Sequence, residues 1–355
     1  MHIVITRRAP LDVPDGINIS IFSLAQELIG SGHEVTMVST GSNNEQKIRD
    51  LYQMKRYPAV VSLTDNPSID ASYGRAIMAW YRAGRGVVER LRPDLVIING
   101  SVPFAFDAVS CTVSHDLEQR FRQSRTLHRM YKKYTYRKSH FVAATCTELR
   151  SALSQEISLD ESEIRVIPTC FDLSLYTSKP LRERERAILH IGTVDYKNPL
   201  GSIRALARLR GDAKLYLTGK IDDALGQAIA GLPQSVQERI IALGYVSAEL
   251  LRDLLGRVRA VSVPSDYVLP VASPSVIEGF ASGTPVVGST SISQDLLENG
   301  LNGFTADPND DATMAAHFEN LLSDDLLWTR IAECARKRAE RFSATRVAQM
   351  YLDYL

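Results

Sequence analysis

The chain lacks several features that would assign it to a special class of protein. Only four of its 355 residues are cysteines, and Cys111, Cys146, Cys170 and Cys334 are widely scattered. Such spacing fits reduced, mostly buried thiols better than a disulfide framework or a zinc site. Apolar runs are also short, and none approaches the roughly 18 to 20 residues of a membrane-spanning helix.

Net charge is absent as well. Lys plus Arg and Asp plus Glu number 41 each, which excludes a basic surface over the whole chain, so we expect no nucleic-acid partner. Hydrophobic residues make up 45% and charged residues 23%, as is typical of folded enzymes. The opening "MHIVITRRAP" has too short an apolar run for a secretory signal, so we expect a cytoplasmic protein. Histidines and carboxylates do not cluster with metal-ligand spacing, so we expect no metal.

Short β-branched runs alternate with helical patterns along the chain. "IVI" (3–5), apolar residues at helical spacing between 17 and 29, and "EVTMV" (34–38) together predict a βαβ unit. Further strands are predicted at 94–98, 140–144, 164–167, 187–191, 214–218, 259–263 and 285–289. Continuous apolar strands joined by crossover helices indicate parallel sheets buried on both faces, so the expected fold class is α/β.

The pattern restarts after the turn-rich loop "PTCFDLSLYTSKPL" (168–181). We therefore predict two doubly wound domains, at 1–172 and 173–340, followed by a helix in 341–355 whose apolar side chains share one face. Ligands of such sheets bind outside the carboxyl ends of the strands, so the sequence predicts a ligand cleft between the two domains.

The stretch "SPSVIEGFASGTPVV" (273–287) contains a single acid, Glu278, between a potential helix start and a helix end. Ser275 and Glu278 have the spacing of a capping box, which needs no ligand. The N-terminus of such a helix also presents free N–H groups to a pyrophosphate, and a carboxylate one turn later can accept from ribose hydroxyls. The residue pattern by itself leaves both roles open.

The connections after two predicted strands hold further candidates. "TRRAPLDVPDGIN" (6–18) is not a G-x-G-x-x-G fingerprint; its Gly16 could adopt a positive φ beside a ligand, or simply follow Asp15 at an ordinary helix start. In "CTVSHDLEQRF" (111–121), His115 could donate to a sugar hydroxyl or phosphate, or cap the next helix.

Basic residues supply two more candidates. In "HIGTVDYKNP" (190–199), Gly192 permits a close backbone approach, and Lys197 could supply a charge to a phosphate or be a solvated lysine in a turn. "RFRQSRTLHRMYKKYTYRK" (120–138) is basic with aromatics between, as in a helix that lies on an anionic membrane; a solvated helix face is the alternative.

Taken in order, these segments resemble the retaining glycosyltransferases of the GT-B fold, family four of the sequence classification. The resemblance covers nearly the whole chain: "DGINISIFSLAQELIGSGHEVTMVST", "IRVIPTCFD", "ILHIGTVDYKN", "VIEGFASGTPVVGS" and "ENGLNGF" occur in the family's order. It implies two Rossmann-like domains facing a central cleft. The first (1–172) would bind the acceptor and the second (173–340) the nucleotide-sugar, with the C-terminal helix (341–355) returning to the first domain.

The resemblance also implies roles for single residues. His115 matches a histidine near the donor sugar and Lys197 a phosphate-binding lysine, so these two are the catalytic candidates. Glu278 matches an acid that binds the donor ribose. The donor-binding residues that it implies lie on two loops and one helix start: Gly16, Thr193, Lys197, Ser275, Val276 and Glu278.

The chain departs from the family pattern at three positions. Pro270 stands where the family has the first acid of its Glu-x7-Glu motif, and Asp266 is a candidate substitute. Thr193 stands where an arginine usually binds phosphate, and Asp15 replaces the first glycine of the first loop.

The implied activity is transfer of a sugar from a nucleotide diphosphate donor, most often UDP, to a hydroxyl of a glycan, lipid-linked or small-molecule acceptor with retention of configuration. No cofactor is expected, and residues 120–138 are a candidate membrane contact. The missing acid and arginine leave an alternative, a scaffold subunit that binds the nucleotide-sugar without transferring it. A sugar-nucleotide epimerase of the same fold is a third interpretation, for which the sequence offers no acid/base set.

Overall fold

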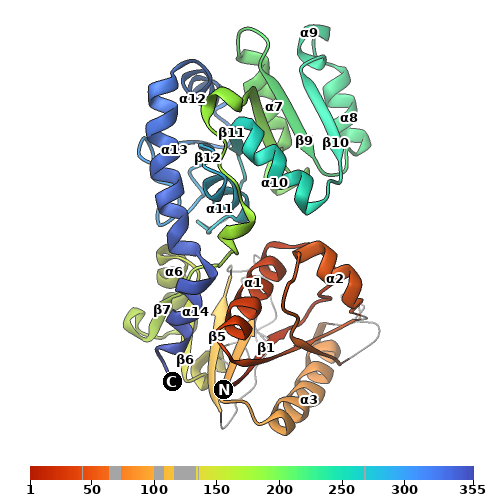
Figure 1. Cartoon of the computed structure of the whole chain (residues 1–355), viewed down its shortest axis with the longest axis vertical. Coiled ribbons are helices and arrows are strands. Elements are labelled where there is room, and N and C mark those ends of the chain that lie inside the picture. The colour runs from red at the N-terminus through yellow and green to blue at the C-terminus, as the bar shows by residue number, and fades with distance from the viewer. Residues whose placement is uncertain (42, 64–72, 100–107, 116–132, 135, 268) are drawn as a thin grey trace. The chain divides into compact units, whose positions relative to one another are not determined.

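The computed structural model describes residues 1–355 except 42, 64–72, 100–107, 116–132, 135 and 268. The chain divides into two compact units, one of Met1–Asp172 with Ser343–Leu355 and the other of Leu173–Phe342. We call these units 1 and 2. Each is built on a parallel sheet with helices, which confirms the α/β fold class (Figure 1).

Unit 1 contains a seven-stranded parallel sheet of order β3-β2-β1-β4-β5-β6-β7. Its strands are β1 His2–Arg7, β2 Glu34–Ser39, β3 Ala59–Ser62, β4 Leu95–Asn99, β5 Val109–Ser114, β6 Phe141–Ala144 and β7 Ile164–Val166. Its helices are α1 Gly16–Gly30, α2 Glu45–Tyr52, α3 Tyr73–Leu91, α6 Thr147–Ile157, the 3-10 turn η1 Glu161–Glu163, and α14 Ala344–Leu352.

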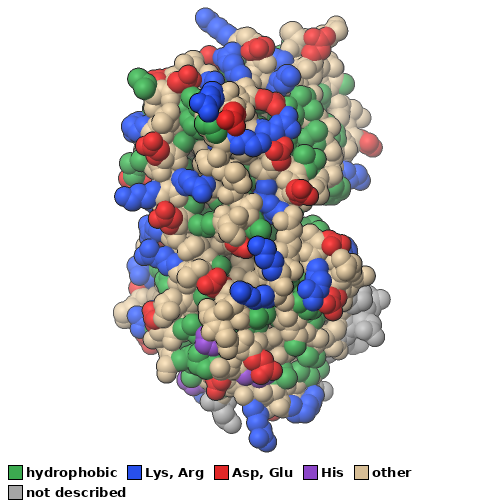
Figure 2. Space-filling view, viewed as in Figure 1, with side chains coloured by type: hydrophobic (Ala, Val, Ile, Leu, Met, Phe, Trp, Pro, Cys, Tyr) green, Lys and Arg blue, Asp and Glu red, His purple; other side chains and the backbone are tan. Residues whose placement is uncertain are grey.

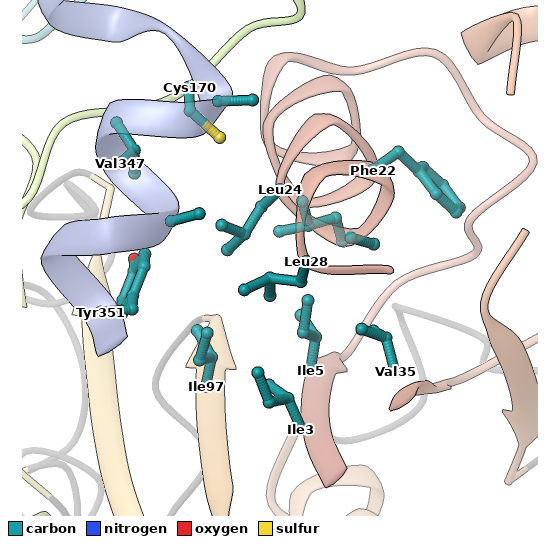
Figure 3. Packing of buried hydrophobic residues seen from close by; sticks show 14 of the residues in the cluster. Ile3, Ile5, Phe22, Leu24, Leu28, Val35, Ile97, Cys170, Val347 and Tyr351 are labelled. Carbon is teal, nitrogen blue, oxygen red and sulfur yellow. The ribbon is translucent and has the colours of Figure 1, made fainter. Parts of the chain in front are cut away.

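Successive residues of the central strands of unit 1 enter two different cores. Ile3 and Ile5 of β1 pack with Leu24 and Leu28 of α1 (Figure 3). Val4, between them, belongs to a second cluster that includes residues of α3. The sheet is therefore buried on both faces, which explains why its strands read as continuous apolar runs.

The C-terminal helix belongs to unit 1. Helix α14 packs against α1, and its Val347 and Tyr351 are almost fully buried in the same core as Leu24 (Figure 3). Met350 and Tyr354 pack at the border of this core. The apolar face predicted for the last helix is thus confirmed, as is its return to the first domain.

Unit 2 contains a six-stranded parallel sheet of order β10-β9-β8-β11-β12-β13. Its strands are β8 Glu185–Ile191, β9 Lys214–Thr218, β10 Ile240–Gly244, β11 Val258–Val263, β12 Val286–Ser289 and β13 Phe304–Ala306. Its helices are α7 Pro199–Arg208, α8 Asp223–Ala230, α9 Gln234–Gln237, α10 Ala248–Arg257, α11 Pro274–Ala281, α12 Asp311–Ser323 and α13 Asp325–Ala339, with 3-10 turns η2 Leu173–Leu175, η3 Leu181–Glu183, η4 Asp195–Lys197 and η5 Glu340–Phe342.

Both sheets change their direction of growth at an equivalent point. The chain adds β2 and β3 on one side of β1 and then returns to place β4 on the other side. In unit 2 it does the same with β9 and β10 before β11. Because ligands of open α/β sheets bind at such points, the carboxyl ends of β1, β4, β8 and β11 are where functional side chains are expected.

The surface shows the charge balance of the sequence. Basic and acidic side chains are interspersed over the face shown in Figure 2, in keeping with the equal numbers of the two kinds. Among the described residues, no helix is both long enough and apolar enough to cross a membrane.

Candidate active site

Helix α11 begins earlier than the capping-box interpretation requires. Its N-cap is Ser273, and Pro274 takes the first helical position, where a missing N–H costs nothing. Ser275 is therefore already inside the helix, and Glu278 lies in its second turn. The capping box between Ser275 and Glu278 is wrong, so Glu278 must be explained by other contacts.

Glu278 is buried at the unit 2 site, with only 7% of its surface exposed. Its Oε1 accepts a hydrogen bond from the Tyr176 hydroxyl at 3.2 Å. Burial raises the pKa of Glu278, while the positive charges of Lys197 and Arg252 and the Tyr176 hydroxyl act in the opposite direction. The Glu278 carboxylate is thus shielded from water and lies near hydrogen-bond donors and positive charges. Such an environment suits a group that accepts hydrogen bonds from ligand hydroxyls.

Lys197 follows β8 in the short turn η4, and its amine donates to the Ile191 carbonyl at 2.9 Å. Burial lowers the pKa of Lys197, and the Glu278 charge opposes that shift. The two side chains, predicted from separate stretches of sequence, are therefore close enough for their charges to interact. Gly192 has a φ of 80°, and a Cβ there would meet the Lys197 amine at 3.0 Å, so the turn requires glycine.

The amides predicted to face a pyrophosphate are only partly available. The Val276 N–H donates to the Ser273 carbonyl at 3.1 Å, which engages it in the first turn of α11. Pro274 has no N–H. In the described part of the chain no carbonyl accepts from the Ser275 amide, so this group is the first donor that α11 offers to an anion.

Thr193 and Asp266 lie beside the same turn. The Thr193 hydroxyl donates to the Lys220 carbonyl at 2.5 Å. The Asp266 side chain is exposed, and its backbone N–H donates to the Tyr196 carbonyl at 2.8 Å, one residue before Lys197. Both residues therefore stand at the edge of the sheet that carries Lys197, while the substitution of Asp266 for the missing acid stays a prediction.

In unit 1, Gly16 is the first residue of α1 and is not among the residues with positive φ. The expectation of a positive φ is wrong, and the ordinary helix start is confirmed. Asp15 is the N-cap and accepts from the Asn18 N–H at 2.7 Å. Its other oxygen lies 3.1 Å from the Arg7 guanidinium. The loop before Gly16 therefore carries the Arg7 guanidinium, whose charge is paired with Asp15.

His115 directly follows β5, and its Nε2 lies 2.8 Å from Oδ1 of Asn99, the last residue of β4. Burial, with a smaller effect from the Arg7 charge, lowers the pKa of His115 to about 3. The imidazole is therefore neutral near pH 7 and can exchange hydrogen bonds with a hydroxyl but does not supply a positive charge. Asp116, beside it in the sequence, lies outside the described residues.

Two other expectations concern parts of the chain that the structure covers incompletely. Most of the basic stretch 120–138 lies outside the described residues. Over the described ranges, no group of three or more His, Cys, Asp or Glu side chains is arranged to hold a metal.

Comparison with known proteins identifies the kind of fold. The family described as "Glycosyltransferase Family 4" matches residues 14–175, and "Glycosyl transferases group 1" matches residues 185–324. The structure of HepE from Anabaena in complex with UDP superposes with a TM-score of 0.78 at 18% identity, covering 100% of this chain and 99% of that one. The chain has the fold of the GT-B glycosyltransferases, and glycosyltransferase family models match both of its units.

Two curated relatives match part of this chain. An uncharacterized glycosyltransferase of Methanocaldococcus jannaschii is 26% identical over 246 residues, which are 64% of this chain and 62% of the relative. The N-acetylgalactosamine-N,N'-diacetylbacillosaminyl-diphospho-undecaprenol 4-alpha-N-acetylgalactosaminyltransferase of Campylobacter jejuni is 26% identical over 211 residues, 57% of this chain and 56% of the relative. The matches thus span less than two thirds of either relative.

Sequence reasoning missed two residues beside Glu278. Tyr176 comes from the linker that opens unit 2, and nothing in "LSLYTSK" distinguishes it from an ordinary loop tyrosine. The Arg252 guanidinium of α10 lies 6.0 Å from the centre of the Tyr176 ring. An arginine on a helix usually faces solvent, so only its neighbours in the fold reveal its place.

Proposed function

We propose that the protein transfers a sugar from a nucleotide diphosphate donor to an acceptor hydroxyl with retention of anomeric configuration. The observation that carries this proposal is that two oppositely charged side chains, the buried Glu278 and the partly buried Lys197, lie close enough at the carboxyl edge of one sheet for their charges to interact. The amine suits a phosphate and the carboxylate suits ribose hydroxyls, so together they suit the two polar parts of a nucleotide diphosphate.

The same arrangement fits the charges of sugar transfer. As the bond to the leaving group breaks, negative charge grows on the diphosphate. A fixed cation at Lys197 and the Ser275 amide at the start of α11 would stabilise that charge. His115, neutral and hydrogen-bonded to Asn99, would orient a sugar hydroxyl. Retention and a uridine base follow from the family resemblance, and the HepE complexes with UDP and UDP-glucose support a uridine donor.

For the acceptor we propose a hydroxyl of a glycan, a lipid-linked sugar or a small molecule, bound by unit 1. The name of the Campylobacter relative includes a diphospho-undecaprenol acceptor, which supports the lipid-linked class. We also propose a cytoplasmic protein that contacts anionic membrane through residues 120–138. Flotation with anionic liposomes tests this contact, and failure to float at low salt would contradict it.

The first experiment is calorimetric titration of the wild type with UDP, GDP, ADP and NAD, repeated with Glu278→Ala. We expect one nucleoside diphosphate to bind, and the variant to bind it at least about tenfold more weakly, roughly 1.4 kcal/mol. Glu298→Ala is the matched control, because Glu298 is an exposed acid of the same unit that pairs with Arg338. Its affinity should equal that of the wild type.

Transfer is then measured with the sugar donors of the nucleotide that binds. Release of nucleotide in the presence of acceptor, with the anomeric configuration of the product read by proton NMR, is the expected result. Binding without hydrolysis or transfer of any donor would contradict the enzyme and favour a scaffold role. Inversion of configuration would contradict only the retaining mechanism.

A further inference from the structure

His190 is a buried residue of β8 to which the proposed reaction assigns no role. It is 1% exposed. Its Nε2 lies 2.8 Å from the Gly192 carbonyl oxygen, and its Nδ1 lies 2.8 Å from the Ser202 hydroxyl of α7. A carbonyl can only accept, so Nε2 carries the proton and Nδ1 accepts from Ser202. The backbone of the turn therefore determines the tautomer of the ring.

The hydrogen bonds continue into the core of unit 2. Because the Ser202 proton is directed to His190, the Ser262 hydroxyl of β11 must donate to Ser202, across 2.6 Å. Burial lowers the pKa of His190 to about 3, which keeps the ring neutral. Three buried polar side chains from two strands and a helix thus form one connected chain that ends on the Gly192 carbonyl. Buried polar groups connected in this way hold their partners in one arrangement.

The end of this chain determines how the next peptide group points. The peptide between Gly192 and Thr193 is planar and trans, so its carbonyl and its N–H point in opposite directions. Because His190 draws the carbonyl toward the core, the Thr193 N–H is directed away from the core. Gly219, with a φ of 110°, lies beside it, and a Cβ there would come within 2.9 Å of the Thr193 nitrogen. A glycine at 219 therefore leaves the amide uncovered.

The same turn carries Lys197. The carbonyl before Gly192, that of Ile191, accepts from the Lys197 amine, which also lies against Gly192 itself. The Lys197 amine and the Thr193 N–H therefore belong to or contact the two consecutive peptide groups on either side of Gly192.

We propose that His190 is a positioning residue for the donor diphosphate. Its Nε2–H fixes the Gly192 carbonyl and so presents the Thr193 N–H, next to the Lys197 amine, to a phosphate oxygen. The inference rests on the proposed function and deepens it. In this chain a backbone donor would take over part of the phosphate contact at the position where the resembling family has an arginine side chain.

The test compares three variants in calorimetric titrations with UDP. His190→Phe keeps an aromatic ring and removes the N–H, whereas the amide of His190→Gln can reach the Gly192 carbonyl. A hydrogen bond from the Thr193 N–H to a charged phosphate oxygen is stronger than one between neutral groups. We therefore expect the phenylalanine variant, which loses the orientation of this N–H, to bind UDP at least about tenfold more weakly, and the glutamine variant to bind it within about threefold of wild type. Ser202→Ala removes the partner of the other ring nitrogen but leaves the Nε2–H bond to the Gly192 carbonyl, so its UDP affinity should stay within about twofold even if its melting temperature falls.

A second readout follows the amide itself. In protein labelled with ¹⁵N-threonine, the Thr193 resonance should shift on addition of UDP in the wild type and in His190→Gln, and should not shift in His190→Phe. If the phenylalanine variant does not fold, His190→Asn replaces it, because the shorter amide can bond Ser202 but cannot reach Gly192.

Unchanged UDP affinity in His190→Phe or His190→Asn would overturn the proposal. So would equal losses of affinity and melting temperature in the phenylalanine and glutamine variants, which would indicate a core residue and nothing more. Titration with pyrophosphate separates this proposal from the proposed function. If the wild type binds pyrophosphate in a His190-dependent way but binds no nucleotide, the donor assignment fails and the positioning role holds. If it binds neither ligand, both fail.

Discussion

The two sheets bring different charge arrangements to the same topological position. In unit 1 the connection after β1 places Arg7 3.1 Å from Asp15, the N-cap of the following helix. In unit 2 the connection after β8 carries Lys197, whose amine donates to the Ile191 carbonyl. Burial lowers the pKa of Lys197, and the negative charge of Glu278, on helix α11, acts against that shift.

This difference teaches how one architecture can serve two kinds of ligand. The charge of Arg7 is compensated within its own loop, and His115 on the same sheet edge is neutral, so this edge suits uncharged hydroxyl groups. Lys197 keeps a carbonyl as its hydrogen-bond partner, which leaves its positive charge available to an anion. The comparison supports binding of the acceptor by unit 1 and of the donor diphosphate by unit 2.

The largest effect should come from Arg184, which is 6% exposed and donates hydrogen bonds inside unit 2. Its acceptors are the carbonyls of Lys179, Leu255, Val258, Ser282 and Gly283 and the Thr284 hydroxyl. Arg184→Leu leaves these buried acceptors with too few donors, so we expect unit 2 to lose on the order of 4 kcal/mol of unfolding free energy.

The two tryptophans allow this loss to be assigned to one unit. Trp80 lies in unit 1 and Trp328 in unit 2. Urea unfolding followed by fluorescence in Trp80→Phe and Trp328→Phe backgrounds reports on each unit separately. The Arg184→Leu substitution should move the Trp328 transition to lower urea concentration and leave the Trp80 transition in place. Equal shifts of both transitions would contradict the assignment of the lost stability to unit 2.

A somewhat smaller effect, on catalysis, is expected when Lys197 is replaced. Lys197→Ala should lower kcat/KM for transfer by about 10²- to 10³-fold, because a fixed donor to the leaving diphosphate is lost. Arg7→Ala is the matched control in unit 1 and should leave the dissociation constant for UDP within about twofold. If the two variants weakened UDP binding equally, the distinction between a compensated and an available cation would be wrong.

Glu278, the buried acid of unit 2, should affect the stability of the folded state in a pH-dependent way. Burial raises the pKa of Glu278 above its ordinary value of 4.5, so the folded state binds this proton more tightly than the unfolded state does. The stability from Glu278 is therefore fully present below pH 4.5 and is lost as pH rises through the folded pKa. Melting temperatures should show Glu278→Gln gaining on the wild type between pH 4 and pH 8. Glu298→Gln, at an exposed acid, is the control, and a gain of the same size there would refute the assignment to burial.

The smallest effect concerns the cap that pairs with Arg7. Asp15→Ala removes the side chain that accepts from the Asn18 N–H, so unit 1 should lose about 1 kcal/mol. The Trp80 transition reports this loss. Asp222→Ala removes the corresponding N-cap of α8 in unit 2, where Asp222 accepts from the Leu225 N–H, and should move the Trp328 transition instead. The opposite assignment of the two transitions would contradict the prediction.

The buried central strands β9 and β11 were predicted, whereas the edge strands β3 and β10 were not. β9 spans the predicted range 214–218, and β11 begins one residue before the predicted 259–263, because both are apolar runs buried within a sheet. β3 and β10 lie at sheet edges and keep most of their side chains only partly buried. Their short, mixed sequences were not predicted as strands, because a strand whose side chains are not buried does not need a continuous apolar run.

The candidate site divides in the same way. The glycine turn at Gly192 was legible from the residues, because a strand followed by glycine predicts a close turn. For Glu278 the local pattern left a cap and a ligand role equally open, and the start of α11 at Pro274, with Ser273 as its N-cap, ruled out the cap. The contact with Tyr176 had no signal in the sequence, since the two residues lie 102 positions apart.

By itself the sequence determined the alternation of strands and helices, the two parallel sheets and the apolar face of the last helix. These features depend on burial and backbone hydrogen bonding among near neighbours, which periodicity records. Only the tertiary structure decided that Lys197 and Glu278 lie close enough for their charges to interact, that Arg7 is paired with Asp15, and that His190 is hydrogen-bonded to Gly192. Those contacts depend on side-chain directions and, for Lys197 and Glu278, on the order of strands that brings distant residues to one edge, which no local pattern encodes.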